Sequence, residues 1–293
     1  MNGDNDLEAS NFNDIFEAFP KPADMMGSKE KMPKTIILGA GQGRRLLSLT
    51  ENMPKCLLPV SGKPIIERQI DTLLAAGIDE ITVVTGFQSS LVEARLQQRY
   101  ANHAPISTIF NPFFEVADNL ASCWIARSVM DSDFLLLNGD TVFDAAVLAK
   151  MLNSDPAPIT LGVDYKSTYD TDDMKVQLDE KGWVKHVSKT LSAAQTDAES
   201  IGLIFFRDRG PQLFRSAVEN ALRHQAALKF WYLNIIDGLA DKQVVNACSV
   251  SGHVWCEIDF AADLARAEAL FAETKGNGIP QSPSIQAELI TDE

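Results

Sequence analysis

The first half of the chain alternates short apolar runs with longer amphipathic segments. Runs rich in Ile, Val, Leu and Phe predict buried strands, and segments with one apolar stripe at helical spacing predict helices between them. Strands joined by helices form right-handed crossovers and therefore a mainly parallel sheet. The pattern predicts an α/β fold with helices flanking the sheet. The predicted strands are 35–38, 81–84, 107–110 and 134–137, and the predicted helices are 64–76, 89–100 and 119–129.

The pattern changes after about residue 155. Shorter alternating segments predict antiparallel strands packed against the first sheet, and two helices follow. We expect one domain over 34–275, with halves 34–155 and 156–275. The acidic, Pro-containing residues 1–33 and the Gly/Pro/Ser-rich residues 276–293 predict disordered tails, although an amphipathic partner-binding helix over 13–19 is an alternative. The later strands are predicted at 159–164, 174–178, 183–187 and 201–206, and the helices at 210–225 and 259–274.

Composition narrows the classes of function. The 293 residues carry a net charge of −14, of which residues 1–30 and 276–293 together contribute −8. An acidic chain repels nucleic-acid phosphates and anionic lipid, so we expect neither nucleic acid nor membrane as a partner. No apolar run approaches the roughly 20 residues that span a bilayer. The four cysteines form no CxxC pair and the N-terminus has no secretory pattern, which favours free thiols and a cytoplasmic location.

A glycine-rich turn directly follows the first predicted strand. Gly39, Gly41 and Gly43 allow backbone N–H groups to approach a phosphate closely. Arg44 stands where a dinucleotide fingerprint needs glycine, and the GK[ST] of a P-loop is absent. The turn is instead followed by lysines, and several cations around a glycine cradle suit a triphosphate. The lysines are Lys55 in PKCLLPV and Lys63 in GKP.

Two acidic positions stand where open α/β sheets bind ligands. Asp140 follows the fourth apolar strand, and Glu257 and Asp259 stand where a short strand gives way to a helix. Mg²⁺ prefers oxygen ligands and usually takes one or two carboxylates plus phosphate oxygens. Asp140 as a turn residue and Asp259 as a helix N-cap are the structural alternatives.

The motifs GAGQGRRL, PKCLLPV and GKP resemble those of the nucleotidyltransferase superfamily, whose members join a nucleoside triphosphate to a sugar 1-phosphate or a related phosphorylated alcohol. The resemblance covers roughly 34–272 and implies a Rossmann-like fold with a smaller antiparallel acceptor-binding region. It implies that Asp140 and Asp259 hold Mg²⁺. The implied catalytic residues are Arg44, Lys55, Asp140 and Lys189, and the implied nucleotide-binding residues are Leu38, Gly39, Ala40, Gly41, Gly43, Arg44, Lys55, Asn119, Ser122 and Asp140.

The segment 111–124 is similar to the phosphocholine and aminoethylphosphonate cytidylyltransferase branch, although Cys123 stands where that branch more often has Leu. There Asn119 and Ser122 could read the base, or they could be ordinary N-caps. Trp183, Trp255 and residues 230–232 could form an aromatic site for an amine or quaternary ammonium group, or simply belong to the core. The implied acceptor-binding residues are Lys175, Lys189, Glu199, Trp231 and Glu257.

We therefore expect a Mg²⁺-dependent enzyme that transfers a cytidylyl group from CTP to a small phosphorylated or phosphonylated amine or alcohol and releases pyrophosphate. A sugar 1-phosphate nucleotidyltransferase using UTP, GTP or dTTP is one alternative. A non-catalytic nucleotide-binding regulatory domain and a dinucleotide-dependent oxidoreductase are alternatives of other classes. The head group of the acceptor and the oligomeric state stay open.

Overall fold

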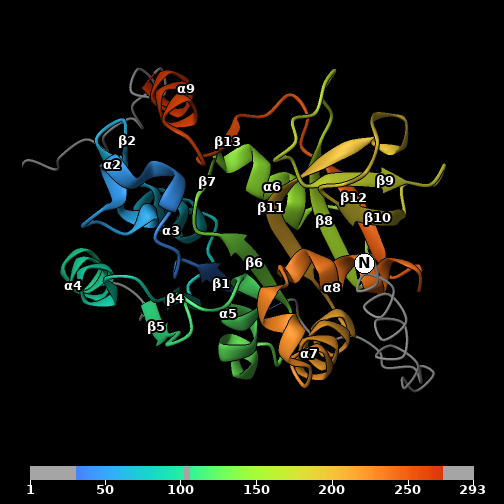
Figure 1. The fold of residues 1–293 in the computed structure, drawn as a ribbon, viewed down its shortest axis with the longest axis horizontal. Coiled ribbons are helices and arrows are strands. Elements are labelled where there is room, and N and C mark those ends of the chain that lie inside the picture. Colours follow the sequence, from blue (N-terminus) through green and yellow to red (C-terminus); the bar gives the residue numbers. More distant parts are fainter. Residues whose placement is uncertain (1–30, 102–105, 273–293) are drawn as a thin grey trace, which may run out of the picture.

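The predicted parallel strands form the centre of one sheet (Figure 1). The computed structural model describes residues 31–101 and 106–272, and most of each predicted tail, including the proposed helix over 13–19, lies outside them. The four strands run in the order β6-β1-β4-β5, and each pair of neighbours is parallel. Their bounds are β1 (Lys34–Leu38), β4 (Ile81–Thr85), β5 (Ile106–Phe110) and β6 (Phe134–Asn138).

Helices cover both faces of this sheet because its central strands are apolar on both faces. Successive side chains of a strand point to opposite faces, and Ile36 and Ile37 of β1 accordingly belong to two different buried apolar clusters. One cluster also takes side chains from α5, α7 and α8, and the other from α3, α4 and α6. These helices are α3 (Ile65–Ala75), α4 (Ser89–Tyr100), α5 (Asn119–Ile125), α6 (Ala145–Leu152), α7 (Gly210–Ala221) and α8 (Tyr232–Ala240).

The first predicted helix, 64–76, ends just before Gly77, as the sequence predicts. Gly77 has φ +83°, which favours glycine. Its N–H donates to Leu74 O, and the N–H of Ile78 donates to Leu73 O, both at 3.0 Å. The third predicted helix, 119–129, is instead divided into α5 and a 3₁₀ turn, η4 (Ala126–Val129).

The later strands extend the first sheet rather than packing against it. β11 (Ala198–Phe206) pairs antiparallel with β6 through Leu203–Phe206 and with β9 through Ala198 and Glu199. All nine residues of β11 are buried, as expected of a strand inside the sheet. β12, which the sequence pattern does not predict, pairs parallel with β8. The other strands of this part are β8 (Ile159–Asp164), β9 (Lys175–Leu178), β10 (Val184–Ser188) and β12 (Val245–Ser249).

Two small hairpin-like sheets carry the loops around the predicted site. β7 (Thr141–Phe143) pairs antiparallel with β13 (Trp255–Glu257), and β2 (Pro59–Val60) pairs with β3 (Lys63–Pro64). α9 (Ala261–Ala272) lies beside β13 and β2 (Figure 1). The remaining short elements are η2 (Arg44–Leu46), α2 (Leu47–Thr50), η3 (Lys55–Leu57), η5 (Ala193–Gln195) and η6 (Gln225–Lys229).

Two expectations from composition agree with the described part of the chain. All four cysteines are free, and each is buried. Among the described residues, no helix has both the length and the apolar character needed to cross a membrane.

Candidate active site

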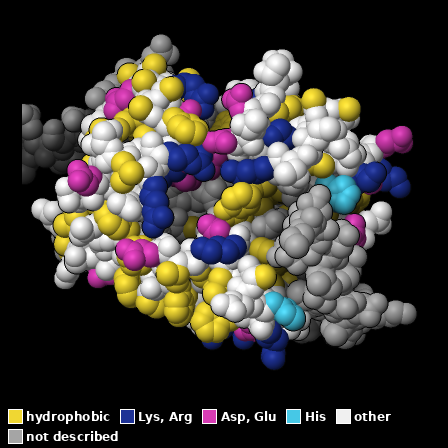
Figure 2. All heavy atoms as spheres, in the orientation of Figure 1, with side chains coloured by type: hydrophobic (Ala, Val, Ile, Leu, Met, Phe, Trp, Pro, Cys, Tyr) yellow, Lys and Arg dark blue, Asp and Glu magenta, His cyan; other side chains and the backbone are white. Residues whose placement is uncertain are grey.

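A cavity of about 480 Å³ opens at the carboxyl ends of β1 and β6. Figure 2 shows Lys and Arg side chains gathered around a hollow near the middle of one face, with acidic side chains among them. This edge is where open α/β sheets bind ligands, because the loops that follow neighbouring parallel strands meet there. The predicted residues that line the cavity are Leu38, Ala40, Gly41, Gly43, Arg44, Lys55, Asn119, Ser122, Asp140, Lys189, Trp231, Glu257 and Asp259.

The glycine-rich loop forms one wall and is held tightly. Gly43 has φ +74°, and a Cβ atom there would lie 2.9 Å from Lys55 Cδ. The hydroxyl of Thr50 donates to Gly43 O at 2.9 Å, which ties the loop to α2. Gly39 does not line the cavity but packs against β4, where its N–H donates to Val84 O at 2.9 Å. The loop therefore needs glycine at position 43 both for its backbone conformation and for the path of Lys55.

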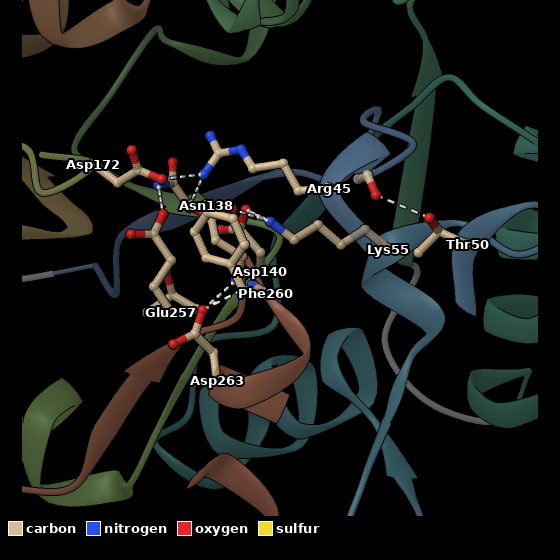
Figure 3. A network of polar contacts seen from close by, with 12 residues as sticks. Arg45, Thr50, Lys55, Asn138, Asp140, Asp172, Glu257, Phe260 and Asp263 are labelled. Carbon is tan, nitrogen blue, oxygen red and sulfur yellow. Dashed lines mark hydrogen bonds and ion pairs between the residues drawn. The ribbon is translucent and has the colours of Figure 1, made fainter. Parts of the chain in front are cut away.

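Lys55 joins the two acidic positions that lie far apart in the sequence (Figure 3). Its Nζ lies 2.6 Å from Asp140 Oδ2 and 2.7 Å from Asp259 Oδ1. The pairing of β7 with β13 produces this arrangement, because Asp140 precedes one strand and Asp259 follows the other. Lys55 is 8% exposed. Burial lowers its pKa, but the two carboxylates outweigh burial and raise the pKa above its ordinary value.

Arg45 is a site residue that the sequence analysis missed. Its NH1 lies 2.8 Å from Asp259 Oδ2 and 3.0 Å from Asp172 Oδ2, and its guanidinium lies 5.3 Å from the centre of the Phe260 ring. Arg44 also lines the cavity, but these ion pairs belong to Arg45. Two adjacent arginines cannot be distinguished by spacing alone, because the course of the η2 turn decides which one points toward the carboxylates.

Asp259 does not cap the helix that follows it. α9 begins at Ala261, and the carboxylate of Asp263 accepts hydrogen bonds from the backbone N–H groups of Asp259 and Phe260. The Asp259 carboxylate instead faces Lys55 and Arg45. Burial raises the pKa of Asp259, but these cations outweigh burial and hold the pKa below its usual value.

Glu257 lines the same cavity. Burial, together with Asp140 and Asp259 nearby, raises the pKa of Glu257 to about 8. Its Oε1 lies at the limit of hydrogen-bond distance, 3.5 Å, from Asn138 Nδ2. The acidic side of the cavity therefore contains Asp140, Asp259 and a third carboxyl, Glu257, whose pKa is raised by burial and by the other two.

The acidic pair suits a hard cation bound together with a substrate. Asp140 Oδ1 is buried and has no hydrogen-bond partner, so one carboxylate oxygen is available within the cavity wall. Among the described residues, no group of three or more His, Cys, Asp and Glu side chains could hold a metal. Mg²⁺ commonly takes one or two carboxylates and completes its coordination with phosphate oxygens and water. The residues present therefore fit Mg²⁺ in the presence of a nucleotide.

Asn119 and Ser122 both line the cavity, and neither caps α5. The residue before the helix is Asp118, which makes no side-chain capping bond. The amide oxygen of Asn119 accepts from the N–H of Tyr232 at 2.9 Å, so its NH₂ group is the end that can reach a ligand. The hydroxyl of Ser122 accepts from Asn111 Nδ2 at 3.0 Å. Both side chains are thus held by residues outside α5.

Two of the predicted acceptor residues lie behind the cavity wall. Lys175 is buried and its Nζ donates to Lys189 O at 3.0 Å, while Glu199 is buried and its Oε2 lies 2.5 Å from Lys166 Nζ. The reason is the alternation of side chains along a strand. Met174 and Ser200, one residue away, are the ones that line the cavity.

The predicted aromatic site is only partly assembled. Trp231 and Tyr232 line the cavity, and Lys189 Nζ lies 4.7 Å from the centre of the Trp231 ring. Trp183 and Trp255 are not among the lining residues, and Trp255 Nε1 donates to Asp164 at 2.8 Å. A cation of the protein itself therefore already occupies the face of Trp231.

Comparison with known proteins agrees with this geometry. Residues 34–158, which include the glycine-rich loop, Lys55 and Asp140, match the family described as Nucleotidyl transferase. This part of the chain resembles the nucleotidyl transferase family. Together with the sheet order, the match confirms the predicted superfamily and the predicted α/β, Rossmann-like class of fold.

Curated relatives extend the similarity beyond the matched segment. The chain is 27% identical over 257 residues to CMP-5'-(3-aminopropyl)phosphonate synthase of Streptomyces rubellomurinus. The aligned region covers 82% of this chain but only 39% of that protein. The chain is 25% identical to CTP:phosphoglutamine cytidylyltransferase of Campylobacter jejuni over 78% of this chain and 96% of the relative. The inositol-1-phosphate CTP transferase of T. maritima has the same fold, with a TM-score of 0.71 and 20% identity over 84% of this chain and 97% of that one.

Proposed function

We propose that this chain is a Mg²⁺-dependent cytidylyltransferase that uses CTP and a small phosphorylated or phosphonylated amine or alcohol and releases pyrophosphate. The observation that carries the proposal is the position of Lys55 between Asp140 and Asp259, beside the glycine-rich loop. This arrangement provides a phosphate-binding loop, a buried cation and two carboxylates in one cavity. The free thiols and the use of CTP also fit the cytoplasmic location expected from the sequence.

The triphosphate would lie along the glycine-rich loop. The space beside Gly41 is open, since a Cβ there would meet no atom within 4 Å. Backbone N–H groups near Gly41 and Gly43 would donate to phosphate oxygens placed in this space. Arg44 and Arg45 would neutralise the β- and γ-phosphates. Lys55, whose raised pKa keeps it charged, would lie near the α-phosphate.

Asp140 and Asp259 would hold Mg²⁺. When bound, the metal ion would supply Lewis-acid polarisation of phosphate oxygens that the two carboxylates and Lys55 cannot supply alone. The ion pairs of Lys55 and Arg45 keep both carboxylates directed into the cavity in the ligand-free protein.

The transfer itself needs little acid–base chemistry. An anionic oxygen of the acceptor's phosphate or phosphonate forms a bond to the α-phosphorus of CTP, and the bond from that phosphorus to the bridging oxygen of the β-phosphate breaks. Pyrophosphate leaves with the electron pair. Because the attacking oxygen is already an anion, the residues contribute alignment and charge neutralisation.

The acceptor would bind between Lys189 and the acidic side of the cavity. Lys189 lies over the ring of Trp231 and is suited to the phosphorus oxyanion. Asp172 and Glu257 lie on the same cavity and could accept hydrogen bonds from an amine. The names of the Streptomyces and Campylobacter relatives contain CMP or CTP together with a phosphonate or phospho compound, which supports this pairing of substrates.

The test is pyrophosphate release with Mg²⁺ and each of CTP, UTP, GTP and dTTP, across phosphocholine, phosphoethanolamine, 2-aminoethylphosphonate, glycerol 3-phosphate and sugar 1-phosphates. We expect turnover with CTP and an amine-bearing acceptor. Equal turnover with dTTP and a hexose 1-phosphate would overturn the cytidylyl assignment and support the sugar nucleotide alternative. Nucleotide binding without pyrophosphate release from any pair would support a regulatory domain.

A further inference from the structure

Asp263 binds the backbone of the turn that carries Asp259. Its Oδ2 accepts hydrogen bonds from the N–H of Asp259 at 3.0 Å and from the N–H of Phe260 at 2.8 Å (Figure 3). The turn connects β13, which ends at Glu257, to α9, which begins at Ala261. The side chain of Asp263 therefore reaches back over the start of its own helix.

These hydrogen bonds constrain the direction of the Asp259 side chain. The first N–H groups of a helix have no partner within the helix, and a carboxylate three residues into it can accept from them. Here one of the two N–H groups belongs to Asp259 itself. Fixing that peptide fixes the direction of the Asp259 Cα–Cβ bond, from which the carboxylate reaches Lys55 with one oxygen and Arg45 with the other.

Asp263 is itself held in place from the side of β13. Arg266 NH2 lies 3.4 Å from Asp263 Oδ1 and donates to Cys256 Sγ at 3.5 Å. The N–H of Ile258 donates to Asp140 O at 3.1 Å, which links the same turn to the other acidic residue. The relative position of the two carboxylates thus depends on a small, connected set of contacts.

We propose that Asp263 is a positioning residue, which holds Asp259 in the orientation needed to bind Mg²⁺ together with the nucleotide. This inference rests on the proposed function and adds α9 to the elements that determine metal affinity. An ordinary helix cap would contribute to folding alone. A positioning residue changes the affinity of the metal–nucleotide complex in a protein that is still folded.

The experiment compares Asp263→Ala, Asp263→Ser and Asp263→Asn with the unmodified chain. Asn keeps an oxygen at the same reach, Ser is too short to accept from both N–H groups, and Ala accepts from neither. Affinity for Mn²⁺·CTP is measured by water proton relaxation, and the KM for Mg²⁺ is measured by pyrophosphate release. We expect Ala and Ser to weaken Mn²⁺·CTP binding about 10-fold or more and to raise the KM for Mg²⁺ similarly, as loss of groups that orient metal ligands commonly does. Asn should restore most of the affinity.

The matched control is Asp179→Ala. Asp179 also accepts two backbone N–H groups, from Lys181 at 2.8 Å and Trp183 at 2.9 Å, but it does not line the cavity. The Asp179→Ala variant should be less stable than the unmodified chain, but its affinity for Mn²⁺·CTP should be unchanged. Folded Asp263→Ala with unchanged Mn²⁺·CTP affinity would overturn the proposal, and if Ala does not fold, unchanged affinity in Asp263→Ser would do so. Failure of the proposed function is distinguishable, because it would appear as an unmodified chain that releases no pyrophosphate.

Discussion

Asp140 has two oxygens in different surroundings. Oδ2 lies 2.6 Å from Lys55 Nζ, whereas Oδ1 is buried without a hydrogen-bond partner. An unpartnered buried carboxylate oxygen is costly in a folded protein unless a ligand uses it. This atom supports the proposal that Asp140 helps to hold a cation in the cavity.

Replacement of Asp140 by Asn should reduce turnover about 10²-fold or more at saturating Mg²⁺. The substitution keeps the shape but removes a charge that would stabilise the metal at the transition state. The rate of pyrophosphate release checks this. Asp144→Asn is a suitable control, because Asp144 caps α6 and does not line the cavity. A rate close to that of the unmodified chain would remove Asp140 from the metal site.

Glu199 is a buried carboxyl that the site does not use. Burial raises its pKa to about 7, although Lys166 opposes this shift. Its ordinary value is 4.5. Between these two pH values the folded protein binds more protons than the unfolded chain, so the contribution of Glu199 to the free energy of unfolding falls as the pH rises.

Glu199→Gln should therefore remove part of the pH dependence of stability. One pKa unit corresponds to about 1.4 kcal/mol, so the difference in unfolding free energy between the unmodified chain and Glu199→Gln should change by at most roughly 3 kcal/mol between pH 4.5 and 7.5. Urea unfolding across this range measures it, with Glu180→Gln on the exposed turn as a control. A constant difference across the range would contradict the shift.

At the scale of elements, the glycine-rich loop and η3 depend on each other. Gly43 adopts φ +74°, and a side chain there would collide with Lys55. Gly62, in the turn between β2 and β3, has a similar φ of +76° but open space around its Cβ position. A substitution at either glycine strains the backbone, but only a substitution at Gly43 also displaces Lys55.

Gly43→Ala and Gly62→Ala should be destabilised to a similar extent, but only Gly43→Ala should be less active. Each substitution should cost about 1–2 kcal/mol of stability, since a non-glycine residue is strained at positive φ. Gly43→Ala should also lower kcat/KM for CTP by roughly 10- to 100-fold, because it shifts Lys55. Thermal unfolding and steady-state kinetics measure the two effects. Equal activity of both variants would show that Lys55 tolerates the displacement.

At the scale of the whole molecule, the cavity connects distant parts of the chain. Arg45 of the first half pairs with Asp172 and Asp259 of the second, and Lys55 pairs with Asp259. A ligand that binds between them stabilises the native state as a whole, because its binding energy is lost when either side unfolds.

CTP with Mg²⁺ should therefore raise the thermal unfolding temperature more than Mg²⁺ alone. At a ligand concentration of 100 times the Kd, the stabilisation expected from mass action is about 2.7 kcal/mol. Differential scanning calorimetry checks this. The Asp140→Asn variant should lose most of the gain, and an absence of any shift at millimolar CTP would argue against nucleotide binding.

Much of this fold could be predicted because it depends on local patterns of apolar residues along the chain. β1 and β6 contain the apolar runs 36–38 and 134–137, and α4 has the predicted bounds of 89–100. The short strand before Asp259 was predicted and corresponds to β13, whereas the three-residue strand β7 was not predicted, because so short a segment has no measurable periodicity. Their pairing could not be predicted from the sequence, although it brings Asp140 and Asp259 together.

By itself the sequence determined the class of fold, the superfamily resemblance, the glycine-rich loop and the two acidic positions, because each depends on residue types in a local pattern. Tertiary structure decided which neighbouring residue faces the cavity. It directed Arg45 toward the carboxylates and placed Lys175 and Glu199 behind the cavity wall. The physical reason is that adjacent side chains differ by direction alone, and direction is set by strand alternation and by contacts between residues far apart in the chain.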